Sequence, residues 1–549
     1  MATLVADQIF MGGRIFCSDP ARRFATTLAV SGGRIMAIGH DEIRDLAGPG
    51  TRIHELAGGL VVPGFIDAHV HPVQGGLERR QCDLSDFDTR EEYVEAVRAY
   101  SETRPEVNWI TGGGWQLSAF PGATPTREEL DLACPDRPVF LPNRDHHGAW
   151  VNSLALELAG VDSATPDPSD GRIERAPDGS PSGTLHEGAM HLVGRLLPIP
   201  TQAELRAALL DAQAYLHSLG ITGWQDAIVG EYANIPDTCD VYRAAAQAGE
   251  LTARVVGALW WQRGRGSEQI EGLVEHRERY HGPNFTPSSV KIMQDGVPEN
   301  FTAAMLEPYL DQTGSPTGNS GLSFVDPTAL RQYVTELDAA GFQVHVHAIG
   351  DRAVREALDA IEAARTNNGP NDLRHHLAHI QVVHPDDIGR FRRLGVSGNM
   401  QPLWAALEPQ MVELTLPFLG EPRSNWQYPF GALLRSGASL GAGSDWPVSS
   451  PNPLWGIHVA VNRRLPPQER DREYDAFLPE QALDLASAVT AYTAGSAYLN
   501  HRDDTGVIAV GNIADLAVLD RDIFAAPPEE ISLANVVATF VGGAQVHAE

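Results

Sequence analysis

Cysteine is scarce in this 549-residue chain, which contains only Cys17, Cys82, Cys134 and Cys239. No two of them stand in a Cys-x-x-Cys spacing, which argues against a thiolate metal site or a redox pair. Four scattered cysteines also argue against a disulfide framework and suit a reducing compartment. We therefore expect a cytoplasmic protein.

Long apolar runs and positive charge are scarce as well. No stretch approaches the roughly 20 uncharged apolar residues that a membrane-spanning helix needs. The N-terminal MATLVADQIFMGGRIF lacks the basic region and apolar core of a secretory signal. With 41 Lys and Arg against 71 Asp and Glu, the net charge is −30. An acidic surface repels nucleic-acid backbones and anionic membranes, so we expect a small-molecule partner and neither of these.

The two ends of the chain share a strand-rich texture. Residues 1–60 contain short apolar runs separated by glycine pairs at 12–13 and 32–33, as in hairpin turns. Residues 500–549 show the same pattern of short apolar runs, for example in GVIAVGNIADLAVLD. A chain of this length exceeds one small core, so we predict a small β-domain built from both ends.

Residues 61–499 alternate between strand and helix patterns. One helix is predicted after Thr201, which forms a capping box with Glu204, and before Gly220. Repeated strand–helix units favour a parallel sheet, and a count of about eight predicts a closed (β/α)8 barrel. A doubly wound open sheet is the alternative. Residues from about 75 to 200 break the alternation, and we interpret them as a large insertion after the first barrel strand that shapes or covers the site.

Polar residues stand at corresponding places on several predicted barrel strands. These residues are His69, His71, Lys291, His347, His379 and Asp445. Each alone has a simpler explanation, such as a core histidine, a turn aspartate or a lysine that extends to solvent. Active sites of parallel barrels lie at the carboxyl ends of the strands. Because buried imidazoles and carboxylates must be paired or bound to metal, the shared placement favours a metal site.

The motifs GFIDAHVH, VKIMQDG, VHAIGD, AH and GSDWP occur in this order. In this respect the chain resembles the metal-dependent amidohydrolase superfamily. GGGWQ, PTREELDLACPDRPVFL, HHGAWVNSLAL and PSGTLHEGA extend the similarity over nearly the whole chain, and they resemble the subgroup that contains N-substituted formamide deformylases. The resemblance implies a TIM-like (β/α)8 barrel at 61–499, and a β-sandwich formed by 1–60 and 500–549.

The resemblance also implies roles for the strand-end residues. His69 and His71 would hold the more buried metal, and His347 and His379 the second. Asp445 would ligate and would move protons. Lys291 matches the position of a carboxylated lysine (N6-carboxylysine) that bridges two metals, since a carbamate avoids the repulsion that an ammonium would meet. We expect one or two divalent ions, Zn²⁺ first, with Mn, Fe or Co as alternatives.

The chain departs from its relatives just before His379, where Ala378 replaces a residue that is often acidic. His375 and His376 therefore compete with His379, although His379 has the best register. His345 lies one pleat deeper than His347, and we expect it to be a core residue or to support the metal ligands.

Other residues are expected to contact substrate. His147 and Trp115 belong to the insertion, and Gln401 and Trp404 follow another strand end. Glu187 matches an acidic position, where it faces the metals or has a structural role. His146 is as well explained by simple exposure.

The expected reaction is hydrolysis of a carbon–nitrogen bond in an amide, formamide or cyclic amide by a metal-bound hydroxide. Asp445 would carry the proton to the leaving amine, and metals or His147 would stabilise the oxyanion. Ester hydrolysis, a barrel decarboxylase or isomerase, and a non-catalytic metal-binding protein are the alternatives. The sequence names no substrate, and a homodimer is expected only as the commonest oligomer.

Overall fold

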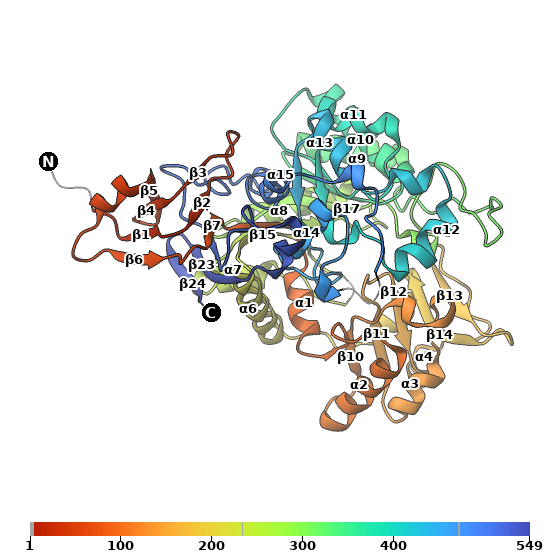
Figure 1. The fold of residues 1–549 in the computed structure, drawn as a ribbon. Coiled ribbons are helices and arrows are strands. Elements are labelled where there is room, and N and C mark those ends of the chain that lie inside the picture. The colour runs from red at the N-terminus through yellow and green to blue at the C-terminus, as the bar shows by residue number, and fades with distance from the viewer. Residues whose placement is uncertain (1–4, 233, 470–472, 549) are drawn as a thin grey trace.

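The computed structural model describes residues 5–232, 234–469 and 473–548. A barrel lies between two further parts (Figure 1). One is a β-rich domain where the red N-terminal and blue C-terminal segments lie together, and the other is an orange insertion that packs below the barrel. Within the described ranges, no helix is long and apolar enough to cross a membrane.

The barrel is an eight-stranded parallel sheet with nearly every strand residue buried. Strands covered on both faces favour apolar residues, although these strands also carry buried polar ones. In spatial order the strands are β8 (Phe65–Val70), β15 (Ile221–Val229), β16 (Arg254–Trp260), β17 (Phe285–Met293), β18 (Gln343–Ala348), β19 (His376–His379), β20 (Ser397–Met400) and β21 (Leu440–Ala442).

The two ends of the sheet, at β8 and β21, lie in contact and nearly close the barrel. Asn399 on β20 donates its side-chain N–H to the carbonyl of Ala68 on β8 at 2.8 Å. Just beyond β21, the backbone N–H of Asp445 donates to the carbonyl of His69 at 2.7 Å. These cross-connections confirm the (β/α)8 barrel over the open sheet.

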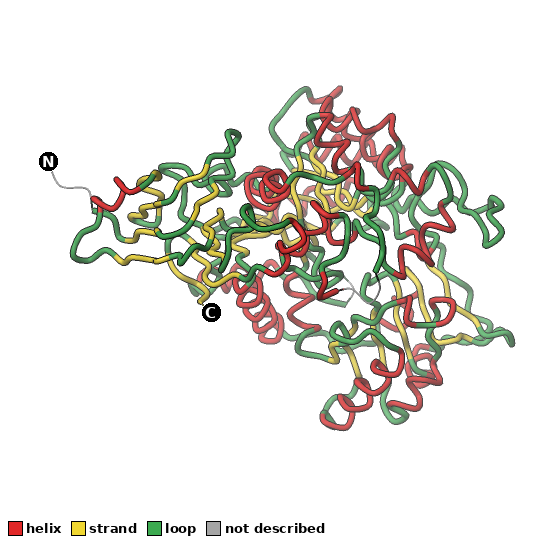
Figure 2. Tube along the Cα trace, in the orientation of Figure 1, coloured by secondary structure: helices red, strands yellow, loops and turns green. Residues whose placement is uncertain are grey.

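Helices surround the strands, red around yellow in Figure 2. Thr201 and Glu204 form the predicted capping box, in which the Thr201 N–H donates to the Glu204 carboxylate at 2.8 Å. The barrel helices are α6 (Gln202–Ser218), α7 (Cys239–Gln247), α8 (Ile270–Tyr280), α9 (Pro327–Ala339), α10 (Asp351–Asn368), α11 (Pro385–Leu394), α13 (Phe430–Ser436) and α14 (Pro453–Asn462).

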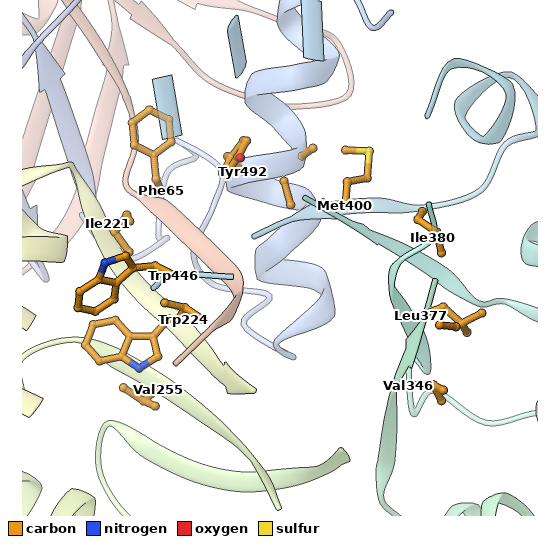
Figure 3. Close-up of a cluster of buried hydrophobic side chains, with 14 of the residues drawn as sticks. Phe65, Ile221, Trp224, Val255, Val346, Leu377, Ile380, Met400, Trp446 and Tyr492 are labelled. Atoms are coloured by element: carbon orange, nitrogen blue, oxygen red, sulfur yellow. The ribbon is translucent and has the colours of Figure 1, made fainter. Parts of the chain in front are cut away.

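Trp224 on β15 belongs to the main core, in the cluster that includes Ile221, Val255 and Trp446 (Figure 3). Its side chain is fully buried. We expect Trp224→Ala to lower the free energy of unfolding by about 3–5 kcal/mol, because the surrounding side chains cannot fully fill the space that the lost indole leaves. Urea unfolding followed by circular dichroism measures this. Leu132→Ala, at a side chain that is 75% exposed, is the control and should change stability little; equal losses would contradict the prediction.

The β-rich domain contains two sheets. One has the order β5 (Arg34–Gly39), β4 (Thr27–Ser31), β1 (Gln8–Met11), β6 (Arg52–Glu55). The other has the order β24 (Ala544–Ala548), β23 (Val536–Val541), β22 (Leu516–Leu519), β7 (Leu60–Pro63), β2 (Arg14–Phe16), β3 (Phe24–Ala25). Because β7 pairs antiparallel with β22, both ends of the chain build one β-sandwich around a shared core, as predicted.

The insertion follows β8 and the short helix α1 (Pro72–Glu78). Its six-stranded sheet has the order β13 (Gly171–Arg175), β14 (Pro181–Glu187), β12 (Gly148–Val151), β11 (Val139–Pro142), β10 (Ile110–Gly113), β9 (Cys82–Asp83). Helices α2 (Arg90–Thr103), α3 (Arg127–Ala133) and α4 (Ser153–Ala159) accompany it. It has apolar cores of its own. The predicted insertion after the first barrel strand is therefore confirmed.

Candidate metal centre and active-site cavity

A cavity of about 850 Å³ opens at the carboxyl ends of the barrel strands. Parallel strands bring these ends to one rim, so residues far apart in sequence become neighbours. Its lining includes all six predicted strand-end residues, His69, His71, Lys291, His347, His379 and Asp445.

Asp445 is the residue around which the histidines gather. Its Oδ1 lies 2.9 Å from Nε2 of His71 and 3.1 Å from Nε2 of His69. Its Oδ2 lies 4.0 Å from Nδ1 of His379. Although burial opposes ionisation, these imidazoles hold the pKa of Asp445 well below its usual value. The side chain is therefore a buried carboxylate with imidazoles around it.

Three of these residues have donor atoms placed for one metal ion. His69, His379 and Asp445 each offer one ligand atom, and the three atoms lie within 4.8 Å of one another. Burial lowers the pKa of His69 to about 3 and that of His379 well below its usual value, so both imidazoles stay neutral. Among the described residues, Nδ1 of His379 has no hydrogen-bond partner. Neutral imidazoles and a carboxylate are donors that zinc and similar divalent metals bind, so the residues fit such an ion.

Lys291 lies beside this group. Its Nζ is 3.4 Å from Nε2 of His69, and its side chain is buried. Burial lowers the pKa of Lys291 to about 7, and the neutral amine is the form that reacts with CO2. Lys291 is also the only lysine of the chain, since every other one of the 41 Lys and Arg residues is arginine.

His347 is held by a carboxylate that sequence reasoning did not single out as functional. Its Nδ1 lies 3.2 Å from Oδ1 of Asp295. Asp295 also accepts the backbone N–H groups of Ala304, Ile349 and Gly350 at 2.8–3.0 Å. A carboxylate behind a histidine orients the other ring nitrogen and makes it a better metal ligand. The ring of His347 lies 4.5 Å from that of His379, centroid to centroid, so the two predicted ligands of the second metal are neighbours.

The competing histidines occupy other places. His345 contacts His69, and its Nε2 lies 2.8 Å from Nδ1 of His69. His375 binds Asp338 at 2.8 Å, away from the cavity. His376 is fully buried, and within the described ranges neither ring nitrogen has a partner. Of the histidines around β19, only His379 is part of the cavity lining described by the structure.

Unusual backbone geometry accompanies the site. His379 has φ 73° and Asp445 has φ 61°, in the left-handed region that non-glycine residues rarely adopt. Such strain costs of order 1–3 kcal/mol per residue and persists where the surrounding structure imposes it. Asp67, which we did not identify from sequence, provides one such constraint: it accepts N–H groups from His69 and Ser444 at 3.0 Å. Gln401 provides another, because it accepts the N–H of His379 at 2.8 Å.

The predicted substrate contacts divide into two groups. His147 and Trp404 line the cavity, where the Trp404 ring stacks on His379 at 5.2 Å between centroids with a 2° tilt. Trp115, Glu187 and Gln401 are outside the described lining. For Trp115 this is a correction: its side chain is fully buried in the core of the insertion, and its indole N–H donates to the Leu141 carbonyl at 2.8 Å.

The other two occupy supporting positions. Gln401 holds the backbone of His379, and Glu187 binds Nδ1 of His147 at 2.9 Å. His146 is not simply exposed, because its Nδ1 lies 2.9 Å from the Gln74 amide and the ring is part of the lining.

Several further lining residues were not among the predicted site residues, although Trp446 lies in the GSDWP motif. They come from α1 and from loops between barrel elements, and they include Gln74, Glu78, Tyr232, Glu299, Tyr428 and Trp446. Burial raises the pKa of Glu78 to about 8 and that of Glu299 to about 7. These residues reach one cavity only because α1 and the loops assemble over the barrel.

Known proteins share this architecture. The chain matches the model of the Amidohydrolase family over residues 52–547. It is 34% identical to the protein LONG AFTER FAR-RED 3 of Arabidopsis thaliana, over 100% of this chain and 92% of that protein. It is 27% identical to the N-substituted formamide deformylase of Arthrobacter pascens, over 98% of each. A crystal structure of an uncharacterised metal-dependent hydrolase from Pyrococcus furiosus has a TM-score of 0.70 at 27% identity, covering 94% of this chain and 99% of that one.

The family match spans the whole barrel and all six strand-end residues at its rim. The solved relative shares the fold over nearly its full length. This chain therefore belongs to the amidohydrolase family and has the fold of the metal-dependent hydrolases.

Proposed function

We propose that the protein hydrolyses a carbon–nitrogen bond of a small amide, with N-substituted formamides as the first candidates. The observation that carries the proposal is the convergence of His69, His379 and Asp445 within 4.8 Å beside a cavity at the barrel rim. The similarity to a formamide deformylase supports the choice of substrate class. A cavity of about 850 Å³ has room for a ligand of small-molecule size.

Zinc is the metal we propose, held first by His69, His379 and Asp445. His71, His347 and a carboxylated Lys291 would complete one or two sites. A bound divalent ion would polarise the substrate carbonyl and lower the pKa of water.

The protein's own groups would then move the proton. The Asp445 carboxylate is ionised. Its Oδ1 faces His69 and His71 within 3.1 Å, and its Oδ2 lies 4.0 Å from Nδ1 of His379. It would accept a proton from the attacking water and deliver it to the leaving amine, as a general base and then a general acid. Trp404, stacked on His379, would bound the space in which the substrate carbonyl lies.

A hydrolysis screen tests the proposal. Purified protein with quantified metal is incubated with N-formyl amines, N-acyl amino acids and cyclic amides. We expect release of an amine and an acid from at least one class, loss of activity after chelation, and recovery with Zn²⁺, Mn²⁺, Fe²⁺ or Co²⁺. Release of CO2 or an isomer would indicate a decarboxylase or isomerase instead. No turnover of any class by metal-loaded protein would contradict the proposal.

We further propose that the protein acts on its small molecule in the cytoplasm, as a homodimer, without a nucleic-acid or membrane partner. The four cysteines are buried and free, and the net charge of −30 disfavours anionic partners. The dimer is supported only by its frequency among oligomers, and light scattering in solution would measure it.

A further inference from the structure

A small side pocket lies next to His71, beside the main cavity. It encloses about 20 Å³, and four of its lining residues, including His71, also line the main cavity. The lining of the side pocket also includes two buried polar side chains, Asp226 on β15 and Thr238 just before α7. A pocket of this volume has room for about one water molecule. Three polar residues therefore surround a space that one very small molecule would fill.

Strand pairing places Asp226 close to His71. In the parallel pair of β8 and β15, Asp226 is in register with Val70, the residue before His71. The Asp226 side chain is held in place, because Oδ1 accepts the N–H of Ile228 at 3.1 Å and Oδ2 accepts the Tyr242 hydroxyl at 2.7 Å. Each carboxylate oxygen can accept a second hydrogen bond. Asp226 can therefore accept one more hydrogen bond from a molecule in the side pocket.

Thr238 occupies a helix-capping position without capping the helix. It directly precedes α7, where a threonine hydroxyl usually accepts a backbone N–H of the first turn. Here Asp237 accepts the N–H of Cys239 at 2.9 Å, and the Thr238 side chain makes no capping bond. Among the described residues, the buried hydroxyl of Thr238 has no hydrogen-bond partner. Since buried polar groups are nearly always paired with protein or with ordered water, this hydroxyl points to a ligand in the side pocket.

His71 has one ring nitrogen left for the same ligand. Its Nε2 faces Asp445 at 2.9 Å, so Nδ1 would carry the ring proton when Nε2 binds a metal. A metal-bound histidine almost always donates its second N–H to an acceptor. His69 and His347 each have a side chain at Nδ1, at 2.8 and 3.2 Å. Within the described part of the chain, no residue hydrogen-bonds to Nδ1 of His71, so its acceptor must come from elsewhere.

We propose that the side pocket binds one water molecule that links His71 to Asp226 and Thr238, and that Asp226 is a positioning residue for His71. The water accepts the Nδ1 proton of His71, donates one O–H to the Asp226 carboxylate and donates the other to the Thr238 oxygen. Three hydrogen bonds are typical of a buried water. The water holds the His71 ring in one tautomer and one orientation, which makes Nε2 a better metal ligand. This inference rests on the metal centre of the proposed function.

A crystal structure of the metal-loaded wild-type protein tests the water directly. We expect one ordered water in the side pocket, with hydrogen bonds of about 2.7–3.2 Å to Nδ1 of His71, to the Asp226 carboxylate and to the Thr238 hydroxyl. A side pocket without density, a water that does not reach His71, or a metal ion in place of the water would overturn the proposal. This experiment needs neither a substrate nor a variant.

Metal binding by variants tests the positioning role. Asp226→Asn should weaken Zn²⁺ binding about 10-fold, the lower end of the range for a group behind a metal-bound histidine, as measured by competition with a chromophoric chelator. Thr238→Val removes the hydroxyl at nearly constant volume and should weaken binding about threefold, as for loss of one hydrogen bond. The control is Ser397→Ala, because Ser397 has a buried hydroxyl that also lacks a partner among the described residues but lines neither space. Its Zn²⁺ affinity should not change.

The absorption spectrum of the Co²⁺-loaded protein separates positioning from a general loss of stability. A turned His71 ring changes the ligand geometry, so the spectrum should change in Asp226→Asn and Thr238→Val and stay the same in Ser397→Ala. Wild-type affinity and spectrum in both pocket variants would overturn the positioning role. If the wild type binds metal and the water but releases no amine from any substrate class, the proposed hydrolysis fails and this inference stands. A wild type that binds no metal would overturn both.

Discussion

Asp445→Asn is expected to lower kcat by about 10³-fold, within the range for loss of a general acid–base. The carboxylate of Asp445 lies within 3.1 Å of two imidazole nitrogens and is held ionised among them. An asparagine amide has the same size as the carboxylate but cannot accept and return a proton near neutral pH. Steady-state kinetics on the best substrate of the screen measures the loss, and circular dichroism checks that the fold is intact.

Metal content decides how this result is read. Asp445 is both a proposed ligand and the proposed proton carrier, so metal must be quantified in the variant. Lost turnover with metal retained supports the proton-transfer role, and restored turnover at high metal concentration would assign the loss to ligation. The control is Asp386→Asn, at a side chain 84% exposed on α11, which should have wild-type kcat. Undiminished activity in Asp445→Asn would refute both roles.

Lys291→Arg is expected to lower kcat by about 10³-fold as well, because loss of a metal's charge stabilisation is worth several kcal/mol. Arginine keeps the positive charge of an uncarboxylated lysine on a slightly longer side chain, but it cannot form a carbamate, since it does not deprotonate in proteins. An uncarboxylated cation 3.4 Å from His69 would repel divalent ions. We expect the variant to bind less metal, which atomic absorption measures. Lys291→Ala should behave alike, whereas wild-type metal content and activity in Lys291→Arg would contradict a bridging carbamate.

The composition of the chain makes the carbamate directly observable. Lys291 is the only lysine, while all other members of the Lys and Arg set are arginine. After exchange into ¹³C-bicarbonate, a carbamate carbon resonance can come only from Lys291 or the terminal amine. We expect this resonance in the metal-loaded wild type and its absence in Lys291→Arg. A wild-type spectrum without it would show that Lys291 has another role.

Much of the barrel rim was predictable because strand geometry is regular. Side chains two apart on a strand point the same way, so His69 and His71 had to face one side. The carboxyl ends of parallel strands share one rim, so His347, His379 and Asp445 were expected near them, and all five line the cavity. Strand-rich ends and an interrupted first repeat likewise predicted the β-sandwich and the insertion.

The contacts between the insertion and the barrel were not predictable in this way. Trp115 carries an aromatic ring in a glycine-rich segment, and only the packing of the insertion placed that ring in its core. Glu187 has an acidic signal, but whether it faces the metals or His147 depends on the pairing of β12 with β14 and on Thr302 from a barrel loop.

The sequence by itself therefore determined the barrel, its strand-end histidines, Lys291 and Asp445, because local periodicity and the order of motifs carry that information. The tertiary structure alone decided which of these atoms converge, and that Asp67, Asp295 and Gln401 hold the candidate ligands. Those supports are hydrogen bonds, several of them between residues far apart in the chain, and no local pattern specifies them.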